Sequence, residues 1–400
     1  MTPSDVVPDR CPQCGANLPP SEGARITCLY CGSSLIRQGV PPRQANAQAG
    51  SPGTWGVHLK TISYVDQQGI GVEAFRMLIP AEWQFQGGVQ WLMNNPGMPA
   101  VIAFRAYNPQ GVEAFEAFPN LPFYWTNNPM VSTSFPPGSV YYGNEVRPPA
   151  PAPQVLCELV VPRFRGQVPG LQIVQQEHLP GLAQQMQANS PVAPTAVTST
   201  DGARVRLRYR LGERDVEEDI YGVVEVSQQS MPMAFPMGGA MQQIFWMADY
   251  LFSFRAQAGQ LDALSDTFMA IVRSFRLNPQ WYARYTQTSQ YMIQNQIQRI
   301  HHIGQISQII SRTGDQISDM VMDSYNQRQQ TLDRLSEQFS QAIRGVDEYH
   351  DASTGRAVEL PAGYDQAWSN GLGEYILSTD PNYDPNRGST MNWEQMGRRD

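Results

Sequence analysis

Short runs of strand-forming residues recur along the chain from residue 57 onward. Each run is rich in Val, Ile, Phe and Tyr and is bounded by Gly, Pro, Asn or Gln. Apolar runs of this length between turn residues are typical of antiparallel strands, so the pattern predicts a sheet. The runs occupy residues 57–65, 72–79, 89–93, 100–107, 112–118 and 242–255.

The segment 201–226 predicts a β-hairpin with one apolar and one cationic face. Arginines at every second position from Arg204 to Arg210 alternate with Val, Leu and Tyr. If Gly212-Glu213 form a two-residue turn, acidic residues of the returning strand lie opposite these arginines. We therefore favour a cross-strand ladder of ion pairs over an anion-binding face. The expected pairs are Arg210 with Asp215, Arg208 with Glu217, and Arg206 with Asp219.

Two later segments change to helical spacing. Residues 259–273 place Leu, Phe, Ile and Val on one face of an amphipathic helix. Residues 281–345 repeat apolar residues every three, four or seven positions, which predicts one long helix or a helical hairpin. The long stripe could lie on the central domain, fold back on itself or pair with another copy, and we favour self-association as a coiled coil in a homo-oligomer. The expected interface residues are Ile303, Ile310, Ile317, Val321, Leu332, Leu335 and Phe339.

Four of the five cysteines form two pairs near the N-terminus. Cys11 and Cys14 are followed, after thirteen residues, by Cys28 and Cys31. Two such pairs suit tetrahedral coordination of one structural Zn²⁺ by four thiolates, although two disulfides or an iron site are alternatives. The arrangement resembles a zinc ribbon. Cys157 stands alone in an apolar run and is expected to be a buried small hydrophobe.

The central segment resembles the PsbP-like and DcrB-like α+β domains. The resemblance rests on Pro80 and Trp83 after an early strand, and on Ser274-Phe275-Arg276 after the closing helix. It implies a binding or accessory role and carries over no catalytic residue. The predicted fold class is therefore α+β, with an N-terminal zinc ribbon, an antiparallel-sheet central domain with helices, a long C-terminal helix and a small β tail module.

Composition divides the chain into five parts. The net charge is −8, and residues 346–400 contain ten acidic residues and four arginines. This acidic balance makes nucleic acid an unlikely partner. The parts are a ribbon at 1–37, a linker at 38–54, the α+β domain at 55–280 with a Pro-rich insertion near 119–153, the helical segment at 281–345 and the acidic module at 346–400.

The tail raises a second metal possibility. Asp380, Asn382, Asp384 and Asn386 alternate, as oxygen ligands do in a calcium loop. Asp and Asn before Pro also favour turns, and we favour that interpretation. Apolar runs fall short of a transmembrane helix and the N-terminus lacks the pattern of a signal peptide, so a soluble, cytoplasmic chain is expected.

Three functions remain open. No common catalytic motif occurs in the sequence, and we favour a non-catalytic zinc-binding scaffold or adaptor with protein partners. The alternative is a ligand-binding or hydrolytic central domain, and a nucleic-acid-binding ribbon ranks last because of the charge. The alternative requires an aromatic pocket, which we expect to be lined by Trp83, Trp91, Tyr107 and Trp125.

Overall fold

The computed structural model divides the chain into two compact units, Met1–Thr54 and Trp55–Asp400. In the first unit, β1 (Arg25–Thr27) pairs antiparallel with β2 (Ser34–Ile36). The residues that the structure describes are 25–27, 34–36, 56–92, 94–179, 196–232, 240–294, 322, 324–330, 332, 346–387 and 389–398.

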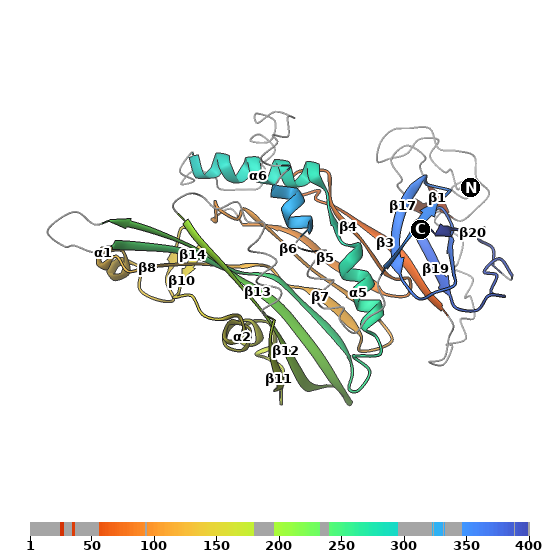
Figure 1. The fold of residues 1–400 in the computed structure, drawn as a ribbon, viewed down its shortest axis with the longest axis horizontal. Coiled ribbons are helices and arrows are strands. Elements are labelled where there is room, and N and C mark those ends of the chain that lie inside the picture. Colours follow the sequence, from red (N-terminus) through yellow and green to blue (C-terminus); the bar gives the residue numbers. More distant parts are fainter. Residues whose placement is uncertain are drawn as a thin grey trace, which may run out of the picture. The chain divides into compact units, whose positions relative to one another are not determined.

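A large sheet forms the centre of the second unit (Figure 1). Its main path runs β11-β12-β13-β14-β7-β6-β5, and β8 also pairs with β14 and carries β10 and β9. The long strands are β12 (Ala196–Leu211), β13 (Arg214–Pro232) and β14 (Ala240–Gln257). The others are β5 (Gln84–Trp91), β6 (Ala100–Tyr107), β7 (Ala114–Ala117), β8 (Leu121–Thr126), β9 (Val140–Tyr141), β10 (Asn144–Val146) and β11 (Gln172–His178).

Two smaller sheets contain the C-terminal strands, and the first of them also contains the early strands β3 and β4. The order in the first is β15-β4-β3-β19-β18-β20, and in the second β17-β16-β21. Because β19 pairs with β3, the acidic tail is part of the same unit as the first strands after residue 55. The strands are β3 (Gly56–Val65), β4 (Glu73–Pro80), β15 (Arg276–Leu277), β16 (Val346–Asp351), β17 (Arg356–Pro361), β18 (Gln366–Ser369), β19 (Glu374–Ser378), β20 (Glu394–Gln395) and β21 (Gly397–Arg398).

Short helices cover both faces of the large sheet. The turn α2 (Ala152–Val155), η1 (Leu156–Val160) and α3 (Val161–Arg165) lies on one face, and α5 (Ser265–Ser274) and α6 (Pro279–Gln294) lie on the other (Figure 1). Residues 324–330 are also helical, and α1 (Pro129–Ser134) follows β8. η1 widens to a π-helix just before Pro162, whose ring lacks an N–H and crowds the preceding turn.

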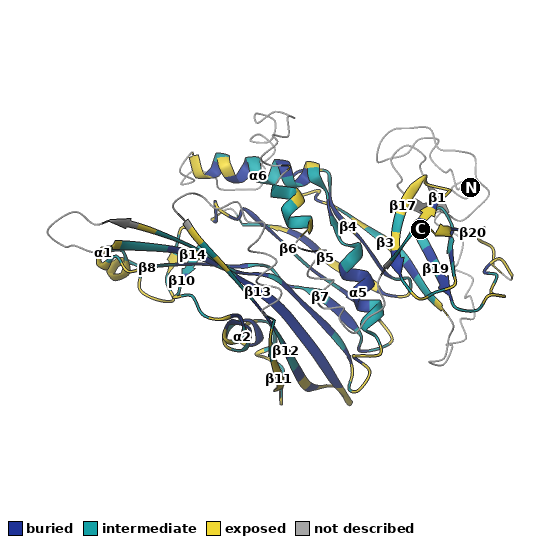
Figure 2. Cartoon of the chain, in the orientation of Figure 1, coloured by how far each residue is buried: buried dark blue, intermediate teal, exposed yellow. Residues whose placement is uncertain are grey.

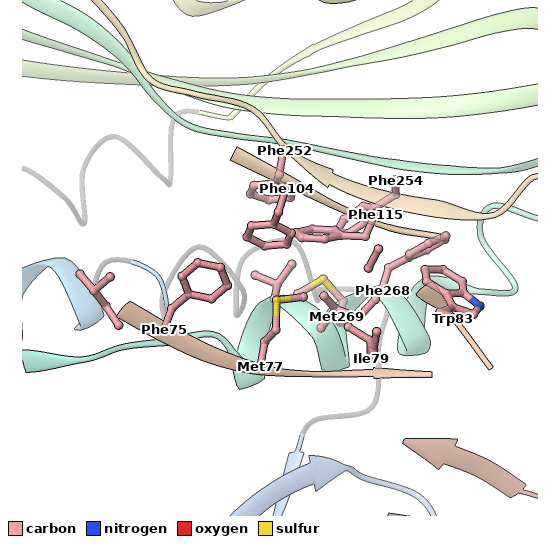
Figure 3. Close-up of a cluster of buried hydrophobic side chains, with 14 of the residues drawn as sticks. Phe75, Met77, Ile79, Trp83, Phe104, Phe115, Phe252, Phe254, Phe268 and Met269 are labelled. Carbon is pink, nitrogen blue, oxygen red and sulfur yellow. The ribbon is translucent and has the colours of Figure 1, made fainter. Parts of the chain in front are cut away.

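An aromatic core fills the space between the large sheet, β4 and α5. Figure 3 shows this cluster, with Phe75 of β4 and Phe104 of β6 among its side chains. These two rings and that of Phe275 stack on one another at centroid distances of 5.2–6.1 Å. Figure 2 shows a buried stretch in α5, and Phe268, Met269, Ile271 and Val272 of this helix belong to the core. Its largest buried members also include Phe115, Phe252, Phe254 and Phe268.

The two short motifs behind the family resemblance meet in this core. Ser274 Oγ accepts a hydrogen bond from the Leu78 amide at 2.8 Å, and β15, which follows it, pairs with β4. The Trp83 ring packs edge-on against Phe268 of α5, with centroids 6.1 Å apart. Both motifs therefore contribute to the packing of α5 and the residues after it against β4 and the residues after that strand.

The structure corrects the predicted fold class. About half of the described residues are in strands and one-fifth in helices, so the unit is strand-dominated rather than an even α+β mixture. No long C-terminal helix occurs among the described residues: α6 is described as far as Gln294, and the other helical residues from 281–345 are 322, 324–330 and 332. Apolar spacing favoured a long helix because it records only that one face is buried, and it does not say how long each helix is.

Other expectations meet mixed outcomes. The Pro-rich segment near 119–153, predicted as an insertion, contains β8, α1, β9 and β10, and β8 (Leu121–Thr126) pairs with β14 as part of the large sheet. The hairpin register is confirmed at all three predicted Arg–acid positions. Among the described residues, no helix is long and apolar enough to cross a membrane.

Candidate functional site

A bulge in β14 sets the geometry of the candidate site. Tyr250 and Leu251 of β14 lie opposite the single residue Gly222 of β13. Tyr250 has a φ of 49°, in the left-handed region, which costs a non-glycine residue about 1 kcal/mol or more. A bulge changes which face the following residues present. As a result, Asp249 and Phe252, three positions apart, line the same pocket.

Glycine at position 222 allows the bulge to pack against the opposite layer. A Cβ there would lie 2.5 Å from Leu251 Cδ2 and 2.8 Å from Leu156 Cδ2 of η1. Both distances are far below van der Waals contact, so a side chain would push the helix or the bulge away. The helical turn on one face therefore supports the geometry of the site on the other.

A charged cluster forms beside the bulge. Arg328 Nη1 and Nη2 each donate to one oxygen of Asp249 at 3.2 Å, and the guanidinium lies 5.0 Å from the centre of the Tyr250 ring. The Asp249 side chain is 2% exposed. Burial alone would lower the pKa of Arg328, but Asp249 and nearby groups more than offset this and raise it above its usual value.

Glu225 is the second carboxyl group of this cluster. Glu225 lies opposite Met247 in the β13–β14 register, and Met247 precedes Asp249 by two residues. Glu225 and Asp249 therefore face the same side of the sheet. Burial, followed by repulsion from Asp249, raises the pKa of Glu225 to about 7, while Arg328 acts in the opposite direction. Within the described part of the chain, no hydrogen bond to the Glu225 carboxyl group is found, whereas Asp249 accepts two from Arg328.

The helical segment that carries Arg328 is tied to the strand before α6. Tyr325 Oη donates to the Leu277 carbonyl at 2.9 Å, and the Leu277 amide donates to Gln329 Oε1 at 3.0 Å. The hydroxyls of Tyr282 and Ser324 are 2.8 Å apart. These bonds fix the position of the guanidinium over the sheet.

An apolar pocket of about 230 Å³ lies between the sheet and these helices. This volume exceeds that of an apolar cavity of about 150 Å³, which suffices to bind benzene. Its walls come from β6, β7, β14, α5 and α6, and its polar groups include Asp249, Arg328 and three tyrosines. The apolar wall includes Phe104, Phe115, Phe252, Val272 and Trp281, and the tyrosines are Tyr250, Tyr282 and Tyr285.

A larger groove of about 880 Å³ adjoins the pocket, because Gly97, Met98 and Met247 line both. Glu225 lines the groove, as does Phe245, which is 44% exposed. Together the two spaces offer a smaller apolar part, a larger adjoining part, and two carboxyl groups near the residues that they share. This is the arrangement of a small-molecule site, which pairs apolar walls with a few placed polar groups.

The four aromatic residues predicted to line a pocket lie apart instead. Trp83 belongs to the aromatic core, and Trp91 Nε1 donates to the buried carboxylate of Asp66 at 3.1 Å. Tyr107 lies under the Arg105 guanidinium, and Trp125 packs in the core on the other face of the sheet. None of the four lines the pocket or the groove, because sequence spacing alone does not say which face of a strand meets which layer.

The predicted zinc ligands Cys11, Cys14, Cys28 and Cys31 lie outside the described residues. The hairpin of β1 and β2 brackets the second cysteine pair in the sequence. β1 ends directly before Cys28.

Of the predicted oligomer interface, only Leu332 is described, and it lines the apolar pocket of its own chain. Ile303, Ile310, Ile317, Val321, Leu335 and Phe339 lie outside the described residues.

Two minor candidates have structural explanations. Cys157 is half-buried, and burial, followed by Glu158, raises the pKa of its thiol, which disfavours the reactive thiolate. Asp380 and Asp384 each accept the amide of the residue two positions later, at 2.9 and 3.0 Å. These are the Asx turns favoured over a calcium loop.

The arginine ladder is neutralised across the hairpin. Arg206 Nε lies 2.8 Å from Asp219, and Arg210 lies 3.2 Å from Asp215. Arg208 pairs with Glu217 at 2.5 Å. Since these arginines are paired within the chain, the ladder offers no anion site of the kind that four unpaired arginines would.

Sequence reasoning missed Glu225, Asp249 and Arg328. Asp249 did leave a signal, because it is the one charged residue in the apolar run IFWMADYLFSF, and a charge buried in a strand needs a partner. Arg328 left none, since it lies in a polar stretch 79 residues away. A scan against protein-family models and a search of curated proteins each found no match to this chain.

Proposed function

We propose that residues 55–400 form a binding module for a small, largely apolar molecule, and that binding rather than catalysis is its task. The pocket beside the charged cluster carries this proposal. Protein interiors are packed with few voids larger than a water molecule. A pocket of about 230 Å³ with the buried Asp249 and its partner Arg328 at one side departs from that rule and supports a ligand site.

The test is saturable binding of N-phenyl-1-naphthylamine, a neutral fluorescent probe of apolar pockets, to the full-length protein. We expect one probe per chain and a fluorescence increase that saturates. Ala117→Phe adds a ring to the pocket wall from β7 and should weaken binding by about tenfold or more.

Ala357→Phe is the matched control, because Ala357 is exposed on β17 and lines neither space. Equal probe affinity in the two variants, with both chains folded by circular dichroism, would contradict a site in this pocket. Probe binding that fails to saturate in the unsubstituted protein would contradict it as well.

A second role concerns the N-terminal unit. We propose that Cys11, Cys14, Cys28 and Cys31 hold one structural Zn²⁺ in a ribbon that contacts protein partners, as the β1–β2 hairpin around the second pair supports. Four thiolate ligands require a reducing compartment, so the proposal includes a cytoplasmic location. Native mass spectrometry should find one zinc per chain, lost in Cys28→Ser and kept in Cys157→Ser; zinc retained in Cys28→Ser would contradict it.

A further inference from the structure

We infer that the ligand of this pocket is an amphipathic amine, whose ammonium group lies between Glu225 and Asp249 while its hydrocarbon part fills the apolar pocket. This inference rests on the binding function proposed above and adds the chemical class of the ligand. It follows from the charges that line the two spaces, from their partners and from the aromatic rings beside them.

The described residues that line the pocket and the groove have a negative charge balance. Among the described residues that line the two spaces, the charged ones are Glu225, Asp249 and Arg328. Two carboxyl groups thus face one guanidinium. When both are ionised, one negative charge is left without compensation in a partly buried place, and a cation supplied by a ligand would balance it.

An anionic ligand fits the same residues poorly. Both terminal nitrogens of Arg328 are already bound to Asp249, and the guanidinium rests on the Tyr250 ring. An incoming carboxylate would have to displace Asp249 and leave that buried acid without its cation. An incoming ammonium group disturbs none of these contacts and adds a partner for Glu225.

The surroundings also suit a cation that carries a hydrocarbon chain. Phe245 lies two residues before Met247 on β14, on the side of the sheet that Glu225 faces, and it is 44% exposed to the groove. An ammonium group gains about 0.5–2 kcal/mol from lying over such a ring. The pocket beyond Met247 is walled by Phe104, Phe115 and Phe252, which favours an apolar chain over a small inorganic cation.

The protonation of Glu225 couples to this binding. Its carboxyl group faces Asp249 of β14 and Arg328 of the helical segment, with Tyr282 and Tyr285 of α6 lining the adjoining pocket. Its pKa is raised to about 7, so ionisation is costly in the free protein. An ammonium group would lower this pKa by favouring the carboxylate, and binding should therefore weaken as the pH falls from 8 to 5.5.

The experiment compares three ligands with the same ten-carbon chain as competitors of N-phenyl-1-naphthylamine on the full-length protein at pH 8. We expect decylammonium to bind about tenfold more tightly than decanol, and decanoate to bind more weakly than either. In Glu225→Gln the preference of the amine over the alcohol should fall to about twofold, while Glu225→Asp, which keeps the charge, should retain most of it. Glu82→Gln removes an exposed carboxylate that is distant from Glu225 in the sequence, and it should leave the preference for the amine unchanged.

The outcomes separate the two proposals. The amine inference is wrong if Glu225→Gln has no effect and the three ligands compete equally or decanoate competes best. In that case, loss of binding in Ala117→Phe would still support a binding site in the pocket. If Ala117→Phe affects none of the ligands, the binding function itself is wrong, and the amine inference falls with it.

Discussion

Glu218 and Glu225 lie seven residues apart on β13, on opposite faces of the large sheet. They differ in their hydrogen-bond partners and in the direction of their pKa shifts. Glu218 is fully buried and accepts hydrogen bonds from Arg165 at 2.6 and 2.9 Å and from Tyr209 at 2.7 Å. Burial would raise the pKa of Glu218, but the bonds from Arg165 outweigh it and lower the pKa. Glu225 has no such bonds among the described residues, and its pKa is raised to about 7.

The difference separates a structural acid from a candidate ligand-binding acid. A buried carboxylate with all of its partners inside the chain holds two layers together and leaves nothing for a ligand. A carboxyl group at a pocket wall that has no hydrogen-bond partner among the described residues is costly to the folded state, and such costs concentrate at functional sites. The contrast holds although both acids come from the same strand.

The largest expected effect breaks the Glu218 network. Arg165→Met removes the only cation that contacts Glu218 among the described residues and leaves a buried carboxylate without compensation. We expect a loss of about 3–5 kcal/mol in the free energy of unfolding, measured by urea denaturation at pH 7.

Arg163→Met is the matched control on the same short helix. Arg163 is 56% exposed and lies 3.8 Å from Glu145, so its loss should cost less than about 1 kcal/mol. Similar losses in the free energy of unfolding of the two variants would show that the Glu218 network contributes no more than an exposed ion pair. The contrast with Glu225 would then be wrong.

The second prediction concerns Glu225, whose substitution should raise the free energy of unfolding instead of lowering it. A carboxyl pKa raised in the folded state contributes stability that is complete below the unfolded pKa of about 4.5 and is lost as the pH rises through about 7. Glu225→Gln removes that loss. We therefore expect the variant to exceed the unsubstituted protein by on the order of 1–3 kcal/mol at pH 8 and to equal it near pH 4.5.

Urea denaturation at the two pH values measures this difference, with Glu82→Gln as the exposed control. A Glu225→Gln chain that is less stable than the unsubstituted protein at pH 8 would mean that the carboxylate has a partner in the folded protein. Glu225 would then belong to the same class as Glu218.

The sequence predicts the hairpin around these acids well and the site itself poorly. Alternation from Arg204 to Leu211 and the Gly212-Glu213 turn determine the register, because a shift of one residue would move every apolar side chain to the wrong face. That information is local. The pairing of Asp249 with Arg328 joins residues far apart in the chain, and no local pattern encodes it.

The bulge at Tyr250 shows a second limit of sequence reasoning. Strict alternation along β14 would place Asp249 and Phe252 on opposite faces, yet both line the pocket. The change of phase depends on Gly222 of the neighbouring strand and on η1 packing behind it. Glycine in a strand hints at a bulge or a close approach, but its location needs both strands.

The smallest expected effect is a reference value for the comparison between buried and exposed acidic residues. The Arg210–Asp215 pair joins side chains that are 69% and 66% exposed, whereas in the Arg206–Asp219 pair the exposed fractions are 17% and 5%. Solvent screening leaves the first pair little energy, so Arg210→Ala should change the free energy of unfolding by less than about 0.5 kcal/mol. Arg206→Ala should cost about 1–3 kcal/mol, because it leaves the buried Asp219 without its closest cation. If both substitutions cost the same in urea denaturation, burial would not be what distinguishes acid–arginine pairs in this sheet, and the separate treatment of Glu218 and Glu225 would lose its physical basis.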